Sequence, residues 1–382
     1  MLSERHLIIV GTGVAGCAAA LSARAANGEA QITLIGAEPH VPYDRTHLSK
    51  YQLMVDANLA GSELFPVGSF EREHIDLRTG IKIIGINPDT KMLTLSNDET
   101  MSYDVLILAT GSIARPIPEF WNALPASRIH SIRVAEDANR LRKALINTRK
   151  LVIIGAGLIG LEVAAAARAR QIEVTVVDTA SRILARSCDE ATASRVAHIH
   201  QDHGVILHLK ASITGVGVTS NGNPELTLSD GTTLIADHIV IGIGVLPDTA
   251  LAEMAHLDIN NGILVDVYGQ TSHPNIYAAG DVACLPLSHN TYPVRLETWR
   301  HAQEHGRQVG ANAVGLKQAY DRPPSFWSDQ YSHRIQGVGL ITDDEVKIVV
   351  RYYDNGTQLS FLLASDQTLR AVIGLDCGKD VN

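Results

Sequence analysis

Two glycine-rich hexapeptides have the spacing that binds a dinucleotide, Gly11–Gly16 and Gly155–Gly160. In a GxGxxG loop the first glycine allows a tight turn, the second lets the backbone approach a pyrophosphate, and the third lets a helix pack on its strand. The amides at the start of that helix then face the phosphates. Two copies in one chain therefore predict two dinucleotide sites.

A carboxylate follows each loop at the distance expected of a ribose-binding acid, which is about 20 residues. Glu38 lies 27 residues after Gly11, and Asp178 lies 23 residues after Gly155. Because such a carboxylate repels a 2′-phosphate, Asp178 favours NADH over NADPH. Arg182, four residues later, would weaken that preference.

The elements that must position these loops are repeated as well. Each copy contains a strand, a helix and a second strand, at 6–10, 17–26 and 31–38 in the first and at 151–154, 161–170 and 173–178 in the second. This order is typical of a βαβ unit with a parallel sheet. Apolar runs at 103–111 and 237–244 predict a closing strand for each copy, and alternating segments such as 91–95 and 225–228 predict antiparallel ribbons.

We therefore predict an α/β fold of two Rossmann-like dinucleotide-binding domains, the second inserted in the first, and a small C-terminal α+β domain. The predicted limits are 1–112 with 245–320 for the first domain, 113–244 for the second and 321–382 for the last. In the last segment, the alternating stretches 346–353, 358–364 and 369–375 predict an antiparallel meander.

Composition excludes several other classes of protein. The net charge of −9 argues against a nucleic-acid partner, and every apolar run ends well before the ~18 residues of a membrane span. The first residues lack a secretory signal pattern. The cysteines show no CxxC spacing, which excludes a zinc ribbon or a local redox dithiol; they are Cys17, Cys188, Cys284 and Cys377. We expect a cytoplasmic protein.

Three other patterns have simpler interpretations than a site. His301–His305 matches an HxxEH zinc signature, but we expect it to be part of a helix near the cofactor and predict no metal ligands. The histidines at 198, 200, 203 and 208 share no face and are expected to be solvated. Asn355–Thr357 fits a glycosylation sequon, but a hairpin turn explains it better.

Beyond the glycine loops, several segments resemble the oxygenase-coupled NADH–ferredoxin reductases, a branch of the FAD-dependent pyridine nucleotide-disulfide oxidoreductases. They are VPYDRTHLSK at 41–50, ATGS at 109–112, IYAAGDVA at 276–283, ETW at 297–299 and FWSDQ at 326–330. The resemblance implies a glutathione-reductase-like fold with FAD in the first domain and NADH in the second. Thr46-His47 replaces the family's double proline, which predicts a looser turn before Lys50. The chain also ends at Asn382, where relatives usually continue into a helix.

The resemblance also implies roles for individual residues. Lys50, nearest the flavin ring, and Glu162, near the nicotinamide, would form a catalytic pair. The residues implied to bind FAD are Gly11, Thr12, Gly13, Val14, Ala15, Gly16, Glu38, Arg45, Lys50, Ala109, Thr110, Gly111, Gly280, Asp281, Glu297, Thr298, Trp299 and Trp327. Those implied to bind NADH are Gly155, Gly157, Leu158, Ile159, Gly160, Glu162, Asp178, Arg182, Gly242 and Gly244.

The residues alone leave simpler roles open. Glu162 could be a first-turn acid favoured by the helix dipole, and Lys50 a solvated loop lysine. Trp299 and Trp327 could be core aromatics. Arg295, Arg300 and Arg307 could form a basic patch for an acidic partner or could lie on a solvated helix.

The function implied by the resemblance is electron transfer from NADH through FAD to a [2Fe–2S] ferredoxin, possibly Rieske-type, which feeds a terminal oxygenase of an aromatic-ring-hydroxylating system. A flavin suits this task because it accepts a hydride and releases single electrons. The alternatives are an NADH–rubredoxin reductase and an NADH-sensing flavoprotein without a dedicated iron–sulfur acceptor. A disulfide, peroxide or oxygen reductase would need a cysteine beside the flavin, and residues 43–50 contain none.

Overall fold

The computed structural model describes residues 5–54, 59, 61–288, 290, 292–340, 347–353, 356–377 and 381. The chain forms two compact units, each built from separate stretches. The first unit comprises Met1–Asp44, Ala60–Ile113 and Leu246–Pro324, and the second comprises Arg45–Leu59, Ala114–Val245 and Ser325–Asn382. The predicted α/β fold with two Rossmann-like sheets is confirmed, with one parallel sheet in each unit.

Some predictions fall on residues outside those described. They concern the start of the chain at 1–4, the first residue of the meander at 346, the sequon asparagine at 355, and the last residues at 378–380 and 382. Around the sequon, the amide of Tyr353 donates to the carbonyl of Thr357, and the amide of Gly356 donates to the carbonyl of Tyr353. These two bonds close the predicted hairpin turn.

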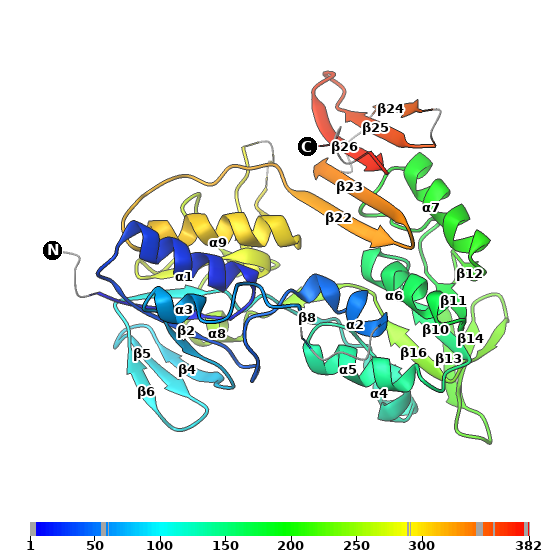
Figure 1. Ribbon diagram of the computed structural model, residues 1–382, viewed down its shortest axis with the longest axis horizontal. Helices are drawn as coiled ribbons and strands as arrows, with labels where there is room; N and C mark the ends of the chain where they lie inside the picture. The colour runs from blue at the N-terminus through cyan, green and yellow to red at the C-terminus, as the bar shows by residue number, and fades with distance from the viewer. Residues whose placement is uncertain are drawn as a thin grey trace. The chain divides into compact units, whose positions relative to one another are not determined.

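The first unit is built on a five-stranded parallel sheet with the strand order β19-β7-β1-β2-β3 (Figure 1). Its strands are β1 (His6–Val10), β2 (Gln31–Ile35), β3 (Asp76–Arg78), β7 (Val105–Leu108) and β19 (Ile276–Ala278). All four residues of β7 are buried, as expected of an apolar run covered on both faces. The predicted closing strand at 103–111 is therefore β7, and it ends just before the Ala109–Gly111 segment.

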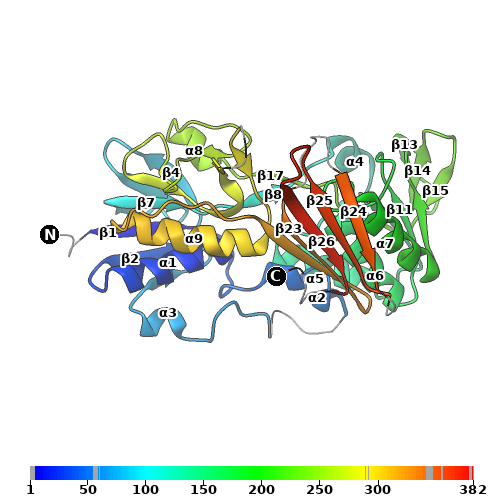
Figure 2. The same cartoon turned by 90° about the horizontal axis from the view of Figure 1, so that it is seen from above.

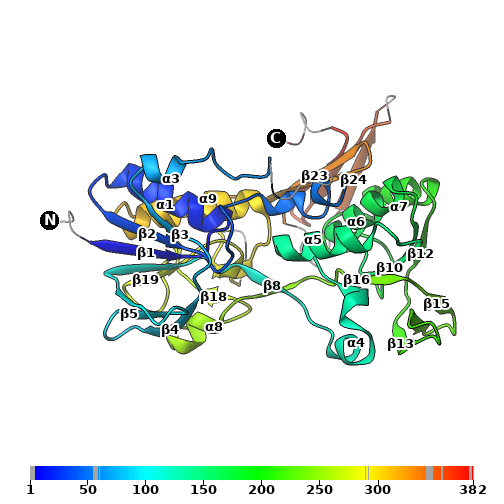
Figure 3. The same cartoon turned by 60° about the horizontal axis from the view of Figure 1, so that its bottom comes forward.

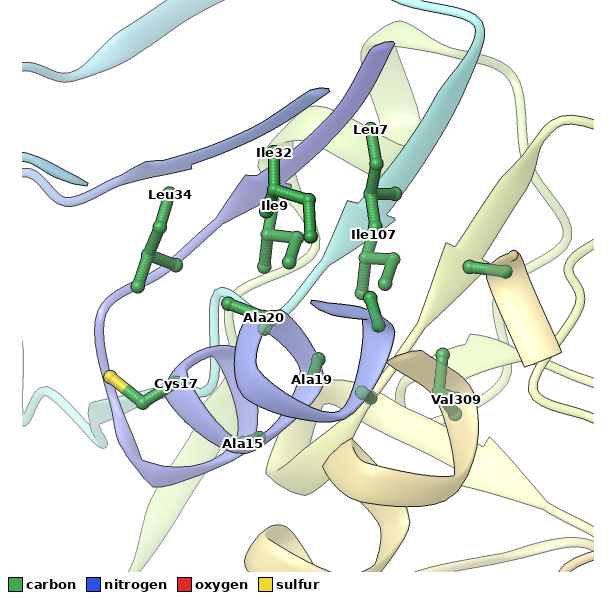
Figure 4. Packing of buried hydrophobic residues seen from close by; sticks show 14 of the residues in the cluster. Leu7, Ile9, Ala15, Cys17, Ala19, Ala20, Ile32, Leu34, Ile107 and Val309 are labelled. Atoms are coloured by element: carbon green, nitrogen blue, oxygen red, sulfur yellow. The ribbon is translucent and has the colours of Figure 1, made fainter. Parts of the chain in front are cut away.

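Helix α1 (Val14–Ala26) packs between this sheet and helix α9 (Trp299–Ala313). Figure 4 shows Ala20 of α1 beneath Ile9 of the sheet, with Val309 of α9 on another side of α1. The alanines let α1 lie close to both neighbours, because they fill little space between the backbones.

Two glycines of α9 set its distance from α1. A Cβ atom at Gly306 would collide with the carbonyl oxygen of Ala15, and one at Gly310 would collide with that of Ala19. The two backbones therefore touch at positions four residues apart along each helix, which is the repeat that brings helix surfaces together. This contact fixes the middle of α9 beside the start of α1.

The remaining elements of the first unit are short. An antiparallel ribbon contains β4 (Ile83–Asn87), β5 (Met92–Leu95) and β6 (Thr100–Ser102), and a small sheet contains β18 (Ile263–Leu264), β20 (Ala283–Leu285) and β21 (Val294–Arg295). The helices are α3 (Ser69–Arg72), α8 (Ala250–Met254) and the 3-10 turn η3 (Gly280–Val282). Strands β8 (Ser112–Ala114) and β17 (Val245–Pro247) lie where the chain passes from one unit to the other.

The second unit repeats the design with a five-stranded parallel sheet in the order β12-β11-β10-β16-β9. Its strands are β9 (Ile129–His130), β10 (Lys150–Ile154), β11 (Glu173–Val177), β12 (Val205–His208) and β16 (His238–Ile241). In Figure 3 the helices α5 (Ala135–Ala144), α6 (Leu158–Ala169) and α7 (Glu190–Asp202) lie on one side of this sheet. The other side carries α4 (Pro118–Ala123) and the ribbon of β13 (Ile213–Val218), β14 (Pro224–Leu228) and β15 (Thr233–Ile235).

The C-terminal segment adds an antiparallel sheet to the second unit, in the order β22-β23-β26-β25-β24 (Figure 2). Its strands are β22 (Ser325–Gln330), β23 (His333–Gly339), β24 (Lys347–Tyr352), β25 (Gln358–Leu363) and β26 (Leu369–Leu375). Helix α7 packs on β25 and β26, and α6 packs on β22. The predicted meander is confirmed, but the described residues from 325 to 377 contain no helix, so the helices against this sheet come from the Rossmann-like part of the unit.

The longest helix of the described residues is α9, with 15 residues. No helix in the described part of the chain has the length and apolar character needed to cross a membrane.

The contact between α1 and α9 predicts a strong effect for one added methyl group. Gly310→Ala should lower the free energy of unfolding by about 1–3 kcal/mol, because the backbone of α1 cannot yield as a flexible side chain would. Urea unfolding measures this difference. Gly28→Ala is the matched control, since a Cβ atom there meets nothing within 4 Å. Equal unfolding midpoints for the two variants would contradict the close contact.

Candidate functional site

The first glycine loop has the steric features that a dinucleotide requires. Gly11 has a φ of +116°, and a Cβ atom there would collide with the carbonyl oxygen of Ala109. A Cβ atom at Gly16 would collide with the carbonyl oxygen of Gly11. At Gly13, in contrast, a Cβ atom would meet nothing within 4 Å. Two glycines thus serve packing, and the middle one leaves open space beside the backbone for a pyrophosphate.

The second loop repeats this arrangement in the second unit. Gly155 has a φ of +108°, and a Cβ atom there would collide with the carbonyl oxygen of Gly242. A Cβ atom at Gly160 would collide with the carbonyl oxygen of Gly155, and at Gly157 it would meet nothing within 4 Å. The same division of roles in both loops supports two sites of one kind.

The helices that follow these loops begin without a side-chain cap. The N-cap residues of α1 and α6 are Gly13 and Gly157, and neither helix has an acidic residue in its first turn. Helices α7 and α9, in contrast, are capped by the side chains of Asp189 and Thr298. The first amides of α1 and α6 are therefore available to an anion such as a dinucleotide phosphate.

The two predicted ribose-binding carboxylates are held in different ways. Tyr43 donates its hydroxyl hydrogen to Glu38 Oε2 at 2.5 Å. Asp178 follows β11 directly and accepts the amides of Ala156 at 2.6 Å and Ala180 at 2.8 Å. Asp178 is therefore fixed against the second glycine loop itself.

Strand β2 is shorter than predicted, so Glu38 lies beyond its end. The strand ends at Ile35, not at residue 38. A Cβ atom at Gly36 would collide with the Thr12 side chain, and the amide of Gly36 donates to the carbonyl of Arg78. The chain leaves the sheet where it passes close to the first glycine loop.

Arg182 makes its contacts within its own loop. Its guanidinium donates to the carbonyl oxygens of Cys188 at 2.7 Å, Ala185 at 3.0 Å and Leu184 at 3.4 Å. These bonds hold the segment after β11. The predicted weakening of the NADH preference would require the guanidinium to leave these carbonyls.

Asp281 is positioned by tight packing around the glycine before it. Gly280 has a φ of +76°, and a Cβ atom there would lie 2.6 Å from the Cβ of Ala15. The Ser112 hydroxyl donates to Asp281 Oδ2 at 3.4 Å. The Asp281 carboxylate therefore lies at a turn that packs against the start of α1, directly after the first glycine loop.

The histidines of the zinc-like signature are buried parts of α9. His305 Nδ1 accepts the amide of Gly280 at 3.2 Å, and His301 Nδ1 lies 3.0 Å from the Tyr320 hydroxyl. Burial lowers the pKa of His305 to about 4 and holds that of His301 well below its ordinary value. Within the described residues, no cluster of three metal-ligating side chains occurs. His305 instead holds the turn that carries Asp281.

The other first-unit residues predicted for FAD lie at element ends. Ala109, Thr110 and Gly111 follow β7, and the Thr110 hydroxyl donates to the carbonyl of Asp248 at 2.7 Å. Thr298 accepts the amide of His301 through its side-chain oxygen and caps α9, at whose first position Trp299 is half-buried.

Of the three arginines in the predicted basic patch, Arg295 does not lie on the surface. The Arg295 side chain is 7% exposed and pairs with Glu297 at 2.5 Å. Arg300 is about half exposed, although its Nε lies 3.2 Å from Glu304, and Arg307 is exposed. Arg295 is therefore an internal counter-ion for Glu297 rather than a surface charge for a partner.

The second unit brings the predicted catalytic pair together. Lys50 Nζ lies 3.0 Å from Glu162 Oε1, and the Glu162 side chain is only 4% exposed. Ser49 donates its hydroxyl hydrogen to Glu162 Oε2, and Ser328 donates to Oε1 at 2.6 Å. The interpretation of Glu162 as a first-turn acid is wrong, because the first turn of α6 holds no acidic residue, and Lys50 is not a solvated loop lysine, because it pairs with Glu162. The carboxylate is a buried acceptor of three donors.

The turn before Lys50 is closed without the double proline. Arg45–His47 form the 3-10 turn η1, followed by helix α2 (Tyr51–Met54). The amide of Leu48 donates to the carbonyl of Arg45 at 3.1 Å, and that of Lys50 donates to the carbonyl of His47 at 3.2 Å. The predicted looser turn is therefore not found in the backbone hydrogen bonding. Arg45 also donates to the carbonyl of Arg133 at 2.7 Å.

All predicted site residues lie in described parts of the chain, but they are divided between the units. Of the residues predicted for FAD, Arg45, Lys50 and Trp327 belong to the second unit and the others to the first. Trp327 is half-buried in β22. The residues predicted for NADH all belong to the second unit.

Sequence reasoning missed several buried polar residues around Glu162. They are Ser49, Ser328, Gln330 and His200. The alternation of β22 puts Ser328 and Gln330 on one face. In α7, Thr192, Val196 and His200 recur at every fourth position and are all buried, so helical spacing could have identified His200 as an inward residue. The expectation that His200 is solvated is wrong.

The four cysteines are all buried, and none of them forms a disulfide. Burial raises the pKa of the Cys188 and Cys284 thiols, which disfavours the reactive thiolate. The Cys17 thiol donates to the carbonyl of Thr12 at 3.3 Å. None of these four residues has the accessible, activated thiol of a redox cysteine.

The sequence matches the pyridine nucleotide-disulphide oxidoreductase family over residues 5–306, and the reductase C-terminal family over residues 325–382. The chain therefore belongs to the pyridine nucleotide-disulphide oxidoreductases, and its cofactors are FAD and NAD(H). Both glycine loops fit these groups in shape and in their free helix amides.

The individual relatives and solved structures that the chain resembles are reductases of small electron-transfer proteins. The chain is 36% identical over 350 residues to rhodocoxin reductase of Rhodococcus erythropolis, covering 92% of this chain and 82% of the relative. It is 34% identical over 378 residues to the ferredoxin–NAD(+) reductase component of the p-cumate 2,3-dioxygenase system of Pseudomonas putida, covering 98% and 91%. Among solved structures, putidaredoxin reductase in its covalent complex with putidaredoxin has a TM-score of 0.92 at 33% identity, with 99% and 91% covered.

The contact between His305 and Gly280 predicts a selective loss of FAD. His305→Leu should lower FAD affinity about tenfold, because the Gly280 amide loses its acceptor, a loss of about 1–2 kcal/mol. Titration of the deflavinated protein with FAD measures the affinity. His305→Asn, which keeps an acceptor, should restore part of it. The affinity should also fall as the pH drops toward 4, where protonated Nδ1 can no longer accept; unchanged affinity in His305→Leu would contradict the role.

Proposed function

We propose that this chain is the NADH–ferredoxin reductase component of an oxygenase system, with a [2Fe–2S] ferredoxin as its acceptor. The observation that carries the proposal is the pair of open glycine loops, at Gly13 and Gly157, within one chain of this family. The names of the relatives, rhodocoxin reductase and a dioxygenase-system ferredoxin–NAD(+) reductase, support the choice of acceptor. The buried cysteines argue against a disulfide reductase.

The proposal assigns one dinucleotide to each loop. FAD, which takes up two electrons together and releases them singly, would be held by the loop at Gly13 and by Glu38 and Asp281. NADH would be held by the loop at Gly157 and by Asp178. The corresponding domain limits are 1–112 with 245–320 for FAD, 113–244 for NADH and 321–382 for the C-terminal domain.

Lys50 and Glu162 carry the electrostatic part of the proposed mechanism. A flavin gains negative charge on reduction, and the Lys50 ammonium would stabilise that charge. Glu162 holds the ammonium at 3.0 Å, and the Ser49 and Ser328 hydroxyls hold Glu162. The carboxylate therefore holds the Lys50 ammonium in one orientation.

The proposal includes an aromatic-ring-hydroxylating oxygenase downstream and a Rieske-type ferredoxin as one possible carrier. It also includes a cytoplasmic location. Free cysteines are typical of a reducing compartment, and the four of this chain are unpaired with one another.

Electron transfer to defined acceptors tests the function. Anaerobic mixing with NADH in a stopped-flow instrument should bleach the bound flavin, and adding a [2Fe–2S] ferredoxin should then restore its absorbance over many turnovers. Rubredoxin and buffer alone are the comparison arms. Faster turnover with rubredoxin would favour that alternative, and bleaching without turnover on any iron–sulfur carrier would favour an NADH sensor. Flavin that stays oxidised would exclude all three.

The duplicated loops provide a matched pair of variants. Gly13→Ala should weaken FAD retention at least tenfold with little change in the KM for NADH of the enzyme that keeps its FAD. Gly157→Ala should raise the KM for NADH at least tenfold while FAD remains bound. The reason is the same in both: the methyl group fills space that the backbone leaves for a pyrophosphate. Flavin fluorescence and steady-state kinetics measure the two effects, and an exchanged pattern would reverse the assignment of the loops.

A further inference from the structure

A continuous series of buried polar side chains leads away from Glu162 within the second unit. Ser328 Oγ lies 2.6 Å from Glu162 Oε1, and Gln330 Nε2 lies 3.1 Å from Ser328 Oγ. His200 Nε2 lies 2.8 Å from Gln330 Oε1, and the Tyr331 hydroxyl lies 3.3 Å from His200 Nδ1. Ser328, Gln330 and His200 are at most 2% exposed, so water does not replace these contacts.

The orientation of the Gln330 amide in the structure sets the direction of every hydrogen bond in the series. Its oxygen faces His200 and can only accept, so in this arrangement His200 carries its hydrogen on Nε2 and donates to Gln330. Burial lowers the pKa of His200, which keeps the imidazole neutral and leaves Nδ1 to accept from Tyr331. The Gln330 amide then donates to Ser328, and Ser328 donates to Glu162. All the hydrogen bonds therefore point toward the carboxylate.

The direction matters because two of these groups could otherwise turn. A flipped Gln330 amide would present its oxygen to Ser328 and attract the serine hydroxyl away from Glu162. His200 with its hydrogen on Nε2 opposes that flip, because Nε2–H requires an acceptor oxygen at the Gln330 end that faces it. His200 thus determines, through two intermediates, where the Ser328 hydrogen points.

We propose that His200, Gln330 and Ser328 are positioning residues that orient the Glu162 carboxylate and, through it, the Lys50 ammonium for reduction of the flavin. This inference rests on the proposed function, because it takes Lys50 to be the group beside the flavin. We do not propose that His200, Gln330 or Ser328 contacts FAD or NADH. They act by supplying one of the three donors of Glu162 in a fixed direction.

The neighbours of His200 are known, and the same helix offers a control residue for testing its role. His203, on the same helix, stacks on the Tyr331 ring with a centroid distance of 3.7 Å. Arg168 acts electrostatically on Tyr331 and donates to the carbonyl of His203. His198, also on α7, is exposed and lies outside the series, so it offers a matched control.

Three substitutions separate orientation from packing. His200→Leu removes the donor to Gln330 and puts an apolar side chain of similar size in its place. His200→Gln offers an amide N–H in place of Nε2–H and should restore the series. His198→Leu makes the same change on the exposed face of the same helix.

The first readout is the infrared carboxylate band of Glu162 in the oxidised protein without NADH, assigned by its loss in Glu162→Gln. His200→Leu should move this band to higher frequency, because a hydrogen bond to a carboxylate oxygen lowers its antisymmetric stretching frequency and this variant weakens the bond from Ser328. His200→Gln and His198→Leu should leave it near the wild-type value. Since no turnover is involved, this result does not depend on the electron acceptor.

A double-mutant cycle gives the second readout. Ser328→Ala should shift the same carboxylate band, and adding His200→Leu to Ser328→Ala should produce no further shift, because His200 acts through Ser328. Additive shifts would overturn the inference, and so would a wild-type value in His200→Leu.

The third readout connects the series to the reaction. The rate of flavin reduction by NADH should fall about tenfold in His200→Leu, because the Lys50 ammonium loses its fixed position, and should return in His200→Gln. A shifted carboxylate band with an unchanged reduction rate would overturn the positioning role. Normal bleaching by NADH without ferredoxin turnover would instead count against the proposed acceptor alone, and leave the series intact.

Discussion

The whole structure depends on a steric constraint at a few glycines, where a backbone carbonyl occupies the space that a Cβ atom would fill. At Gly11 and Gly155 the lack of a Cβ atom lets strands β1 and β10 turn directly into helices α1 and α6. At Gly306 it lets α9 touch α1. Because these contacts join backbones, they fix the helix starts more firmly than side-chain packing could, and the amides of α1 and α6 acquire a defined position at the ends of their sheets.

Three arginines that the sequence offered for binding a dinucleotide or a partner instead bond to groups of the protein itself. Arg45 donates to Arg133, Arg182 to carbonyls of its own loop, and Arg295 pairs with Glu297. The phosphates of a dinucleotide would therefore be met mainly by uncapped helix amides. That arrangement suits a chain with a net charge of −9, because it binds anions without a basic surface.

The sequence was sufficient for features that are local along the chain. The strands, the glycine loops and the acid at Asp178 follow from patterns a few residues to two dozen residues long. The hydrogen bonds of His200 to Gln330 could not be predicted, because the two residues are 130 positions apart and meet only when α7 packs on the C-terminal sheet. The burial of Arg295 was missed for a similar reason, since a surface cluster and an internal ion pair look alike in sequence. The absence of proline at 46–47 predicted a looser turn, but it does not reveal the backbone hydrogen bonds that close this turn.

The burial of the four thiols has a consequence for durability. A protein that handles electrons in air is exposed to peroxide from electrons that leak to oxygen. Peroxide attacks thiolates, and the buried Cys188 and Cys284 present little of that form. The thiols of this chain are thereby shielded from peroxide, whichever step of the reaction produces it.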